Sequence, residues 1–140
     1  MAIYNYLPKF NYIEPNNLKG LQPGFVVAQE ERVAEELKHA ATGMFENGKI
    51  CALTAAGIVK GTADHKVLFI HYSEPLNTMF SGDELFAVNV AEECPRLVQL
   101  IPGDEWTSTD ANSAIADRII QVEETKMANG DKGYRYIFLG

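Results

Sequence analysis

The sequence predicts a mainly β protein: a small β-sandwich or β-barrel with one short helix and an extended N-terminal arm. Short apolar stretches recur about every 8 to 12 residues from Met44 onward, which is the spacing of all-β domains. Turn dipeptides separate them, most clearly Asn47-Gly48 and Asn129-Gly130. A single segment has helical spacing. At 140 residues the chain has room for one domain, which we place at residues 25–140.

Residues 1–24 differ from the rest and form the predicted arm. Its aromatic residues all occupy even positions, so in an extended chain they share one face: Tyr4, Tyr6, Phe10 and Tyr12. Three prolines argue against a helix or a regular central strand. Aromatic side chains on an extended segment suit binding to a neighbouring subunit by strand addition. Alternatively, they fold back and extend the core of their own domain.

The segment Glu30–Ala41 carries the only helical signal. Val33, Leu37 and either Ala40 or Ala41 fall at positions i, i+4 and i+7 or i+8, and the exposed face is charged. Acidic residues gather at its start and basic residues near its end, as the helix dipole favours. We expect one helix of about three turns. It either covers an open end of the β domain or docks on a partner.

The remaining elements are expected to be strands. They are predicted at residues 25–29, 49–54, 58–60, 66–72, 85–90, 96–101, 105–109, 118–127 and 133–139. Residues 66–72 are apolar at both odd and even positions, which is typical of a strand covered on both faces. The last two strands flank Asn129-Gly130 and are expected to form a hairpin.

Charge and composition exclude several classes of function. The net charge is −7 and the twelve basic residues form no cluster, so nucleic-acid binding is disfavoured. No apolar run reaches the length needed to span a membrane, and the N-terminus lacks a signal-peptide pattern. Cys51 and Cys94 are expected to be buried apolar residues, although a disulfide between them is left open.

Residues with potential chemistry do not form a recognisable catalytic or metal site, and we expect no enzyme and no cofactor. There is no nucleophile elbow or phosphate-binding glycine motif. His65 and His71 are too far apart on one strand to share an ion, so a turn residue and a hydrogen-bonded strand residue are expected. The oxygen-rich segment 103–112 suits a surface loop better than a calcium site. Trp106 is expected to be either an interface anchor or a half-buried core residue.

The central stretch Met44–Thr109 resembles small tailed-bacteriophage virion proteins that decorate the head or associate with the capsid. The resemblance lies in FENGKICALTAAGIVKGTA (45–63), VLFIHYSEPLNT (67–78) and EECPRLVQLIPGDEWTSTD (92–110). It implies a capsid decoration, or cement, subunit in the virion, assembled in the host cytoplasm. Its partners would be the major capsid protein or another virion structural protein, and copies of itself, a trimer foremost.

The leading hypothesis is therefore a virion structural protein whose contacts include Tyr4, Tyr6, Phe10, Tyr12 and Trp106. A second hypothesis is a small-molecule or carbohydrate-binding β module of a virion appendage, with a pocket near Trp106 and Tyr72. A zinc-dependent hydrolase is the least favoured third hypothesis.

Overall fold

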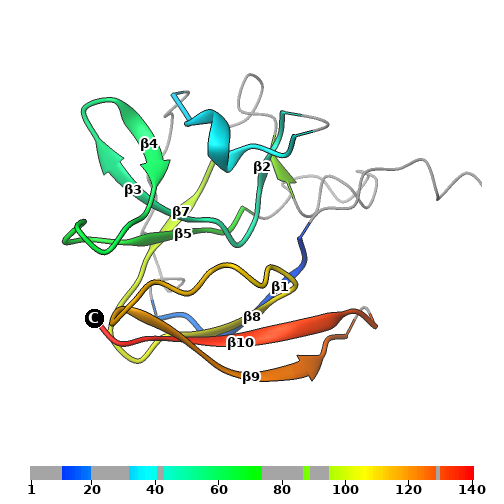
Figure 1. Ribbon diagram of the computed structural model, residues 1–140. Coiled ribbons are helices and arrows are strands. Elements are labelled where there is room, and N and C mark those ends of the chain that lie inside the picture. The colour runs from blue at the N-terminus through cyan, green and yellow to red at the C-terminus, as the bar shows by residue number, and fades with distance from the viewer. Residues whose placement is uncertain (1–10, 20–31, 41–42, 74–86, 89–94, 129) are drawn as a thin grey trace, which may run out of the picture.

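The computed structural model describes residues 11–19, 32–40, 43–73, 87–88, 95–128 and 130–140. It confirms a mainly β protein built from two antiparallel four-stranded sheets (Figure 1). Sheet A has the order β1 (Ile13–Asn17), β8 (Glu105–Ser108), β10 (Lys132–Phe138) and β9 (Ile119–Lys126). Sheet B has the order β4 (Gly57–Lys60), β3 (Ile50–Thr54), β5 (Phe69–His71) and β7 (Leu97–Gln99). A short ribbon pairs β2 (Phe45–Glu46) with β6 (Ala87–Val88).

The two sheets pack face to face around one apolar core. Sheet B contributes side chains such as Ile70 and Val98, and sheet A contributes Trp106, Tyr136 and Phe138. The Trp106 and Tyr136 rings stack with their centroids 5.8 Å apart. Because these strands alternate inward and outward residues, each inward row contributes to the same core.

Sheet B is covered on its other face as well. Phe69 contacts a second cluster formed by Val33, Leu37, Phe45 and other side chains, whereas Ile70 belongs to the core between the sheets. Successive residues of β5 therefore enter different apolar clusters. This confirms the expectation that the strand predicted at 66–72 has two buried faces, although the observed strand is limited to 69–71.

The predicted helix at Glu30–Ala41 is wrong for the part that the structure describes, residues 32–40. Only Glu35–Leu37 is helical, as a single 3-10 turn. Val33 instead forms a parallel bridge with Ile58, and Lys38 forms an antiparallel bridge with Phe45. Val33 and Leu37 are buried as expected, but pairing with sheet strands satisfies the backbone and overrides the helical propensity.

Residues 11–19, which belong to the predicted arm, pack against the domain. Strand β1 pairs with β8, and Ile13 and Leu18 are buried in the core. In this part of the chain the alternative considered from the sequence, folding back on the domain, is what the structure has. Residues 1–10 and 20–31, including the strand expected at 25–29, lie outside the described residues.

The turn predictions are met in part. Strands β9 and β10 form the expected hairpin, with Gly130 at φ 90°. Asn47 and Gly48 form a turn, but β2 pairs with β6, and β3 pairs with β4 and β5. Among the described residues, no helix is long and apolar enough to cross a membrane.

Arg118 ties the two sheets together. Its guanidinium donates hydrogen bonds to the main-chain oxygens of Ala63, His65 and Lys66, in the loop before β5, and to Gly140 after β10. The same group lies 5.9 Å from the centroid of the Phe138 ring. A planar guanidinium can satisfy several carbonyls at once, so one side chain fixes a loop of sheet B against the end of sheet A.

Candidate functional site

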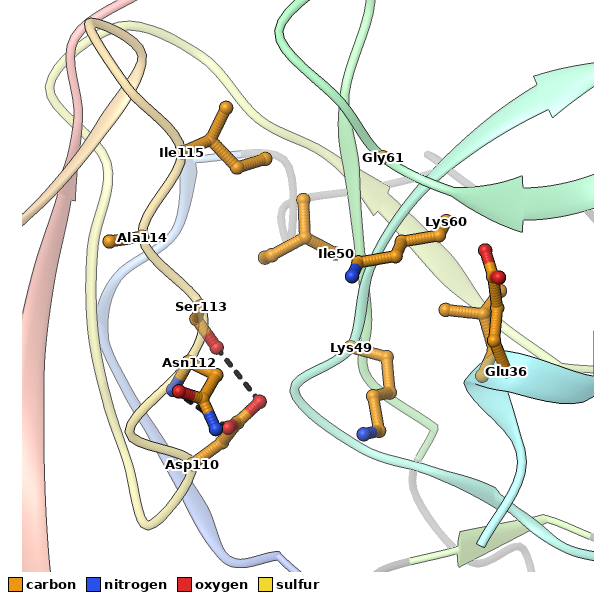
Figure 2. Close-up of a pocket in the computed structure, with 11 residues that line it drawn as sticks. Glu36, Lys49, Ile50, Lys60, Gly61, Asp110, Asn112, Ser113, Ala114 and Ile115 are labelled. Carbon is orange, nitrogen blue, oxygen red and sulfur yellow. Dashed lines mark hydrogen bonds between the residues drawn. The ribbon is translucent and has the colours of Figure 1, made fainter.

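A pocket of about 230 Å³ opens between the two halves of the sandwich. Residues from sheet B and the 3-10 turn form one wall, and the loop between β8 and β9 forms the other (Figure 2). The lining residues are Glu36, Leu37, Lys49, Ile50, Lys60, Gly61, Asp110, Asn112, Ser113, Ala114 and Ile115. These come from distant parts of the chain, so only the folded sandwich brings them together.

Two lysines stand on the sheet B wall because of strand register. Lys60 pairs with Cys51 across the β3–β4 hairpin, and Lys49 lies two residues before Cys51, so both lysines belong to the same face. Their side chains extend towards the opposite loop (Figure 2). At Gly61 the two strands stay close, with its N–H donating to Ile50 O at 2.9 Å. A Cβ added there would lie 2.9 Å from Leu68 Cδ2, so a larger residue would push the pocket wall outward.

The opposite wall is a turn held by its own side chains. Asp110 accepts the Asn112 N–H at 2.9 Å through Oδ1 and the Ser113 hydroxyl at 3.1 Å through Oδ2. The Tyr136 hydroxyl donates to Asp110 O at 2.6 Å and anchors the turn to the core. Burial raises the pKa of Tyr136, which keeps this hydroxyl protonated and able to donate. The wall is therefore preorganised.

The charged groups on the two walls differ in the hydrogen bonds and ion pairs that they form with the rest of the protein. Both carboxylate oxygens of Asp110 accept hydrogen bonds within the turn. Lys49 Nζ lies 3.9 Å from Glu46 Oε1, at the outer limit of an ion pair. Lys60 forms no ion pair with any residue in the part of the chain that the structure describes. The pocket lining therefore holds two ammonium groups, on Lys49 and Lys60, and two carboxylates, on Glu36 and Asp110, and among the described residues neither carboxylate forms an ion pair with these lysines.

A buried serine and histidine lie on a different part of sheet B. His71 Nδ1 lies 2.7 Å from Glu46 O, and its Nε2 lies 2.8 Å from Ser73 Oγ. A carbonyl can only accept, so Nδ1 carries the proton and the Ser73 hydroxyl donates to Nε2. The imidazole also stacks on Phe45 with the ring centroids 3.7 Å apart. Burial lowers the pKa of His71 to about 4, so the ring is neutral at ordinary pH.

This serine and histidine serve the fold. A nucleophilic serine needs a substrate above its oxygen, but His71 has no exposed surface and Ser73 is 7% exposed. Neither residue lines the pocket. The Ser73 oxygen also accepts the Arg96 N–H at 2.9 Å, and Asn47 exchanges two hydrogen bonds with the Ser73 backbone. The network joins the turn after β2 to β5 and to the residue before β7.

Strand β9 presents the longest exposed edge of the two sheets. It pairs only with β10 among the described strands, and seven of its eight residues are exposed. Ile120 and Val122 each expose 39% of their surface. An unpaired strand edge with apolar side chains is a template for pairing with another chain.

The interface residues predicted from the sequence are distributed differently. Trp106 has no exposed surface, which makes it a core residue instead of an anchor for a partner. Tyr12 is half-buried, and its backbone pairs with Thr109 through two hydrogen bonds. Tyr4, Tyr6 and Phe10 lie outside the described residues.

The predictions about small-molecule and metal sites have mixed outcomes. A pocket near Trp106 and Tyr72 was expected, but neither residue lines the pocket. His65 accepts the Thr62 N–H at 3.0 Å within a turn, and His71 is a hydrogen-bonded strand residue, as predicted. Within the described ranges, no three His, Cys, Asp or Glu side chains gather as a metal site.

Sequence reasoning missed Lys49, Lys60 and Ser113 as pocket residues. The one available signal was the Asp110-x-Asn112-Ser113 pattern, which is typical of a side-chain-stabilised turn. Cys51 is free and buried, and burial raises its pKa, so its thiol is not a reactive group. Comparisons with protein-family models, with curated proteins and with solved structures find no match to this chain.

Proposed function

We propose that the protein is a non-catalytic structural subunit that acts by binding other protein subunits. The observation that carries this proposal is the free edge of β9, which offers both main-chain groups and apolar side chains to a second chain. The resemblance of residues 44–109 to virion proteins supplies the setting: a capsid decoration or other head-associated subunit of a bacteriophage.

The other described sheet edges are less suited to strand addition. Strand β1 contains Pro15, which lacks an N–H, and has only five residues. The Ile58 backbone of β4 already pairs with residues 32–34. Strand β7 has only three residues. Strand β9 has eight residues and a charged sequence at one end, which restricts pairing to complementary partners.

A second copy of the chain is the occupant that fits β9 best. When two β9 strands pair antiparallel about Gln121, Ile120 of each copy faces Val122 of the other. The same register places Glu123 opposite Ile119 and brings no two like charges face to face. Ile119 contributes only its side chain to this contact, because its N–H and O already bond Ile115. Two-fold pairing of this kind gives a closed dimer contact, whereas a trimer requires β9 to meet a different edge of the next copy.

The β9 contact alone is weak. Full burial of an Ile or Val contributes on the order of 1.5 to 3 kcal/mol, and these residues are already partly covered. Association costs several kcal/mol in lost rigid-body freedom. Additional contacts, such as those proposed for Tyr4, Tyr6 and Phe10, and attachment of many copies to one shell would supply the remainder.

The first test replaces the apolar edge. Ile120→Lys puts a charge on β9, and Leu53→Lys makes the same change at a site of equal exposure on sheet B. We expect sedimentation analysis to show a concentration-dependent oligomer for the native protein and for Leu53→Lys. Ile120→Lys should shift the association midpoint at least about ten-fold in concentration, equivalent to about 1.4 kcal/mol. A native protein that stays monomeric, or an oligomer unaffected by Ile120→Lys, contradicts the role of β9.

A second test addresses the N-terminal segment. Because β1 belongs to sheet A, removal of residues 1–24 would damage the domain, so the informative truncation removes residues 1–10. We expect the truncated protein to keep its folding stability and to occupy purified phage heads less than the full chain does. Equal occupancy would remove Tyr4, Tyr6 and Phe10 from the proposed contacts.

A further inference from the structure

We propose that the pocket between the sheets binds a small hydroxylated anion, of the size and chemistry of a sugar acid or a sugar phosphate. This inference does not depend on the adhesive function. It rests on the lysines of one wall and the polar turn of the other, which Figure 2 shows facing each other.

Lys49 and Lys60, on the sheet B wall, would bind the anionic group of the ligand. Lys60 has no ion-pair partner among the described residues, and Lys49 has only the 3.9 Å contact with Glu46. An anionic group between the two ammonium groups would gain charge-assisted hydrogen bonds from both. Glu36 and Asp110 also line the pocket, but among the described residues neither forms an ion pair with these lysines, so the ammonium groups remain available to a ligand anion and the carboxylates can accept hydrogen bonds from its hydroxyls.

The turn wall determines the rest of the ligand. The Ser113 hydroxyl donates to Asp110, which leaves its oxygen free to accept a hydrogen bond from a ligand hydroxyl. The exposed Asn112 side chain offers both a donor and an acceptor. Ile50, Leu37 and Ile115 line the pocket with apolar surface against which a carbon skeleton can pack.

The volume limits the ligand to a small one. At about 230 Å³ the pocket lies below the range of roughly 300 to 1,000 Å³ typical of drug-sized ligands. A single sugar ring with one charged substituent is the class that uses both walls. A bare phosphate ion would leave the turn unused, and a neutral sugar would leave the lysines unused.

The test is an NMR titration of the full chain with four probes: glucuronate, glucose 6-phosphate, glucose and inorganic phosphate. We expect at least one of the two hydroxylated anions to shift amide signals of Lys49, Lys60 and the 110–115 turn. Its affinity should exceed that of glucose and of phosphate by about ten-fold, the effect of one good charged or polar contact. Preference between the first two probes tells whether the charged group is a carboxylate or a phosphate.

Variants tie the binding to the pocket. Lys60→Gln and Lys49→Gln are each expected to weaken binding about ten-fold, and Asn112→Ala by a few-fold. Lys66→Gln removes an exposed lysine outside the pocket and should leave the affinity unchanged. The proposal is overturned if neither hydroxylated anion binds, if glucose or phosphate binds as tightly, or if both pocket lysine variants retain native affinity.

Discussion

The buried environment of His71 predicts how the stability of the protein depends on pH. Its imidazole is buried, stacked on Phe45, and bonded at both nitrogens in the neutral form. The sequence predicted a hydrogen-bonded strand histidine at this position, which is confirmed. The sequence could not identify Glu46 and Ser73 as its partners, because they meet only when β2 is placed beside β5.

The first prediction concerns pH. The pKa of His71 is about 4 in the folded protein and near 6.5 in the unfolded chain, so only the unfolded chain binds this proton between those values. Unfolding therefore becomes easier as the pH falls through this window. The stabilisation that comes from the neutral His71 ring is fully present above about pH 6.5. About 3 kcal/mol of the free energy of unfolding is lost by pH 4. Urea denaturation at a series of pH values measures it.

The pH dependence of stability sums over the whole chain, so a matched variant isolates the effect of His71. His71→Gln should lower stability near neutral pH and flatten the slope between about pH 4 and 6.5. His65→Gln changes a half-buried turn histidine outside this hydrogen-bond network and serves as the control. An unchanged slope in His71→Gln would show that the buried ring is not responsible.

At the scale of elements, close approach of two backbones decides which turn residues are tolerated. Gly57 turns the β3–β4 hairpin at φ 109°, and a Cβ there would lie 2.3 Å from Arg32 O. Gly43 also has positive φ, but nothing lies within 4 Å of an added Cβ. Comparing substitutions at Gly57 and Gly43 therefore separates the cost of backbone strain from the cost of steric overlap.

We predict that Gly57→Ala destabilises the protein considerably more than Gly43→Ala. The Gly43 change costs about 1 kcal/mol, the usual price of a left-handed non-glycine residue. The Gly57 change should cost at least about 2 kcal/mol more, because Arg32 must move away from the hairpin. Denaturant midpoints of the two variants measure the difference, and equal values would refute the contact between residue 32 and the hairpin.

Two arginines give a second comparison of this kind. Arg118 bonds main-chain oxygens on both sides of the sandwich, whereas Arg135 lies on the outer surface between Glu105 and Glu123. Surface ion pairs add little to stability, but loss of Arg118 leaves several carbonyls of a connecting loop unpaired. Arg118→Ala is expected to cost about 2 kcal/mol or more, and Arg135→Ala clearly less. The reverse order in thermal unfolding would contradict the tie between the sheets.

Elements with local signals were predictable and those fixed by distant contacts were not. The β9–β10 hairpin follows from the Asn129-Gly130 turn between two predicted strands. The helix predicted over Glu30–Ala41 failed in its described part, because Val33 pairs with the distant Ile58 and Lys38 pairs with the nearer Phe45. The spacing of its apolar residues predicted correctly that Val33 and Leu37 are buried, but it did not predict the backbone conformation.

At the scale of the whole molecule, the regular spacing of short apolar stretches and turns was sufficient to predict a sandwich but not its surface features. The pocket needs Lys49 and Lys60 opposite Asp110 and Ser113, which only the packing of sheet B against the β8–β9 loop achieves. Likewise, the Asn129-Gly130 turn predicts a strand at 118–127, whereas the place of β9 at the end of sheet A follows from topology. Both proposed binding surfaces are therefore tertiary properties.

We propose that the free edge of β9 joins this protein to a second chain. Hydrogen–deuterium exchange of the β9 amides, followed over a range of protein concentrations, tests it most directly. The edge-facing amides of residues 120–126 should exchange quickly in dilute solution and become protected as copies associate, whereas the Ile119 N–H is already bonded to Ile115 O. Exchange that stays equally fast at every concentration, while the amides shared with β10 remain protected, would contradict it.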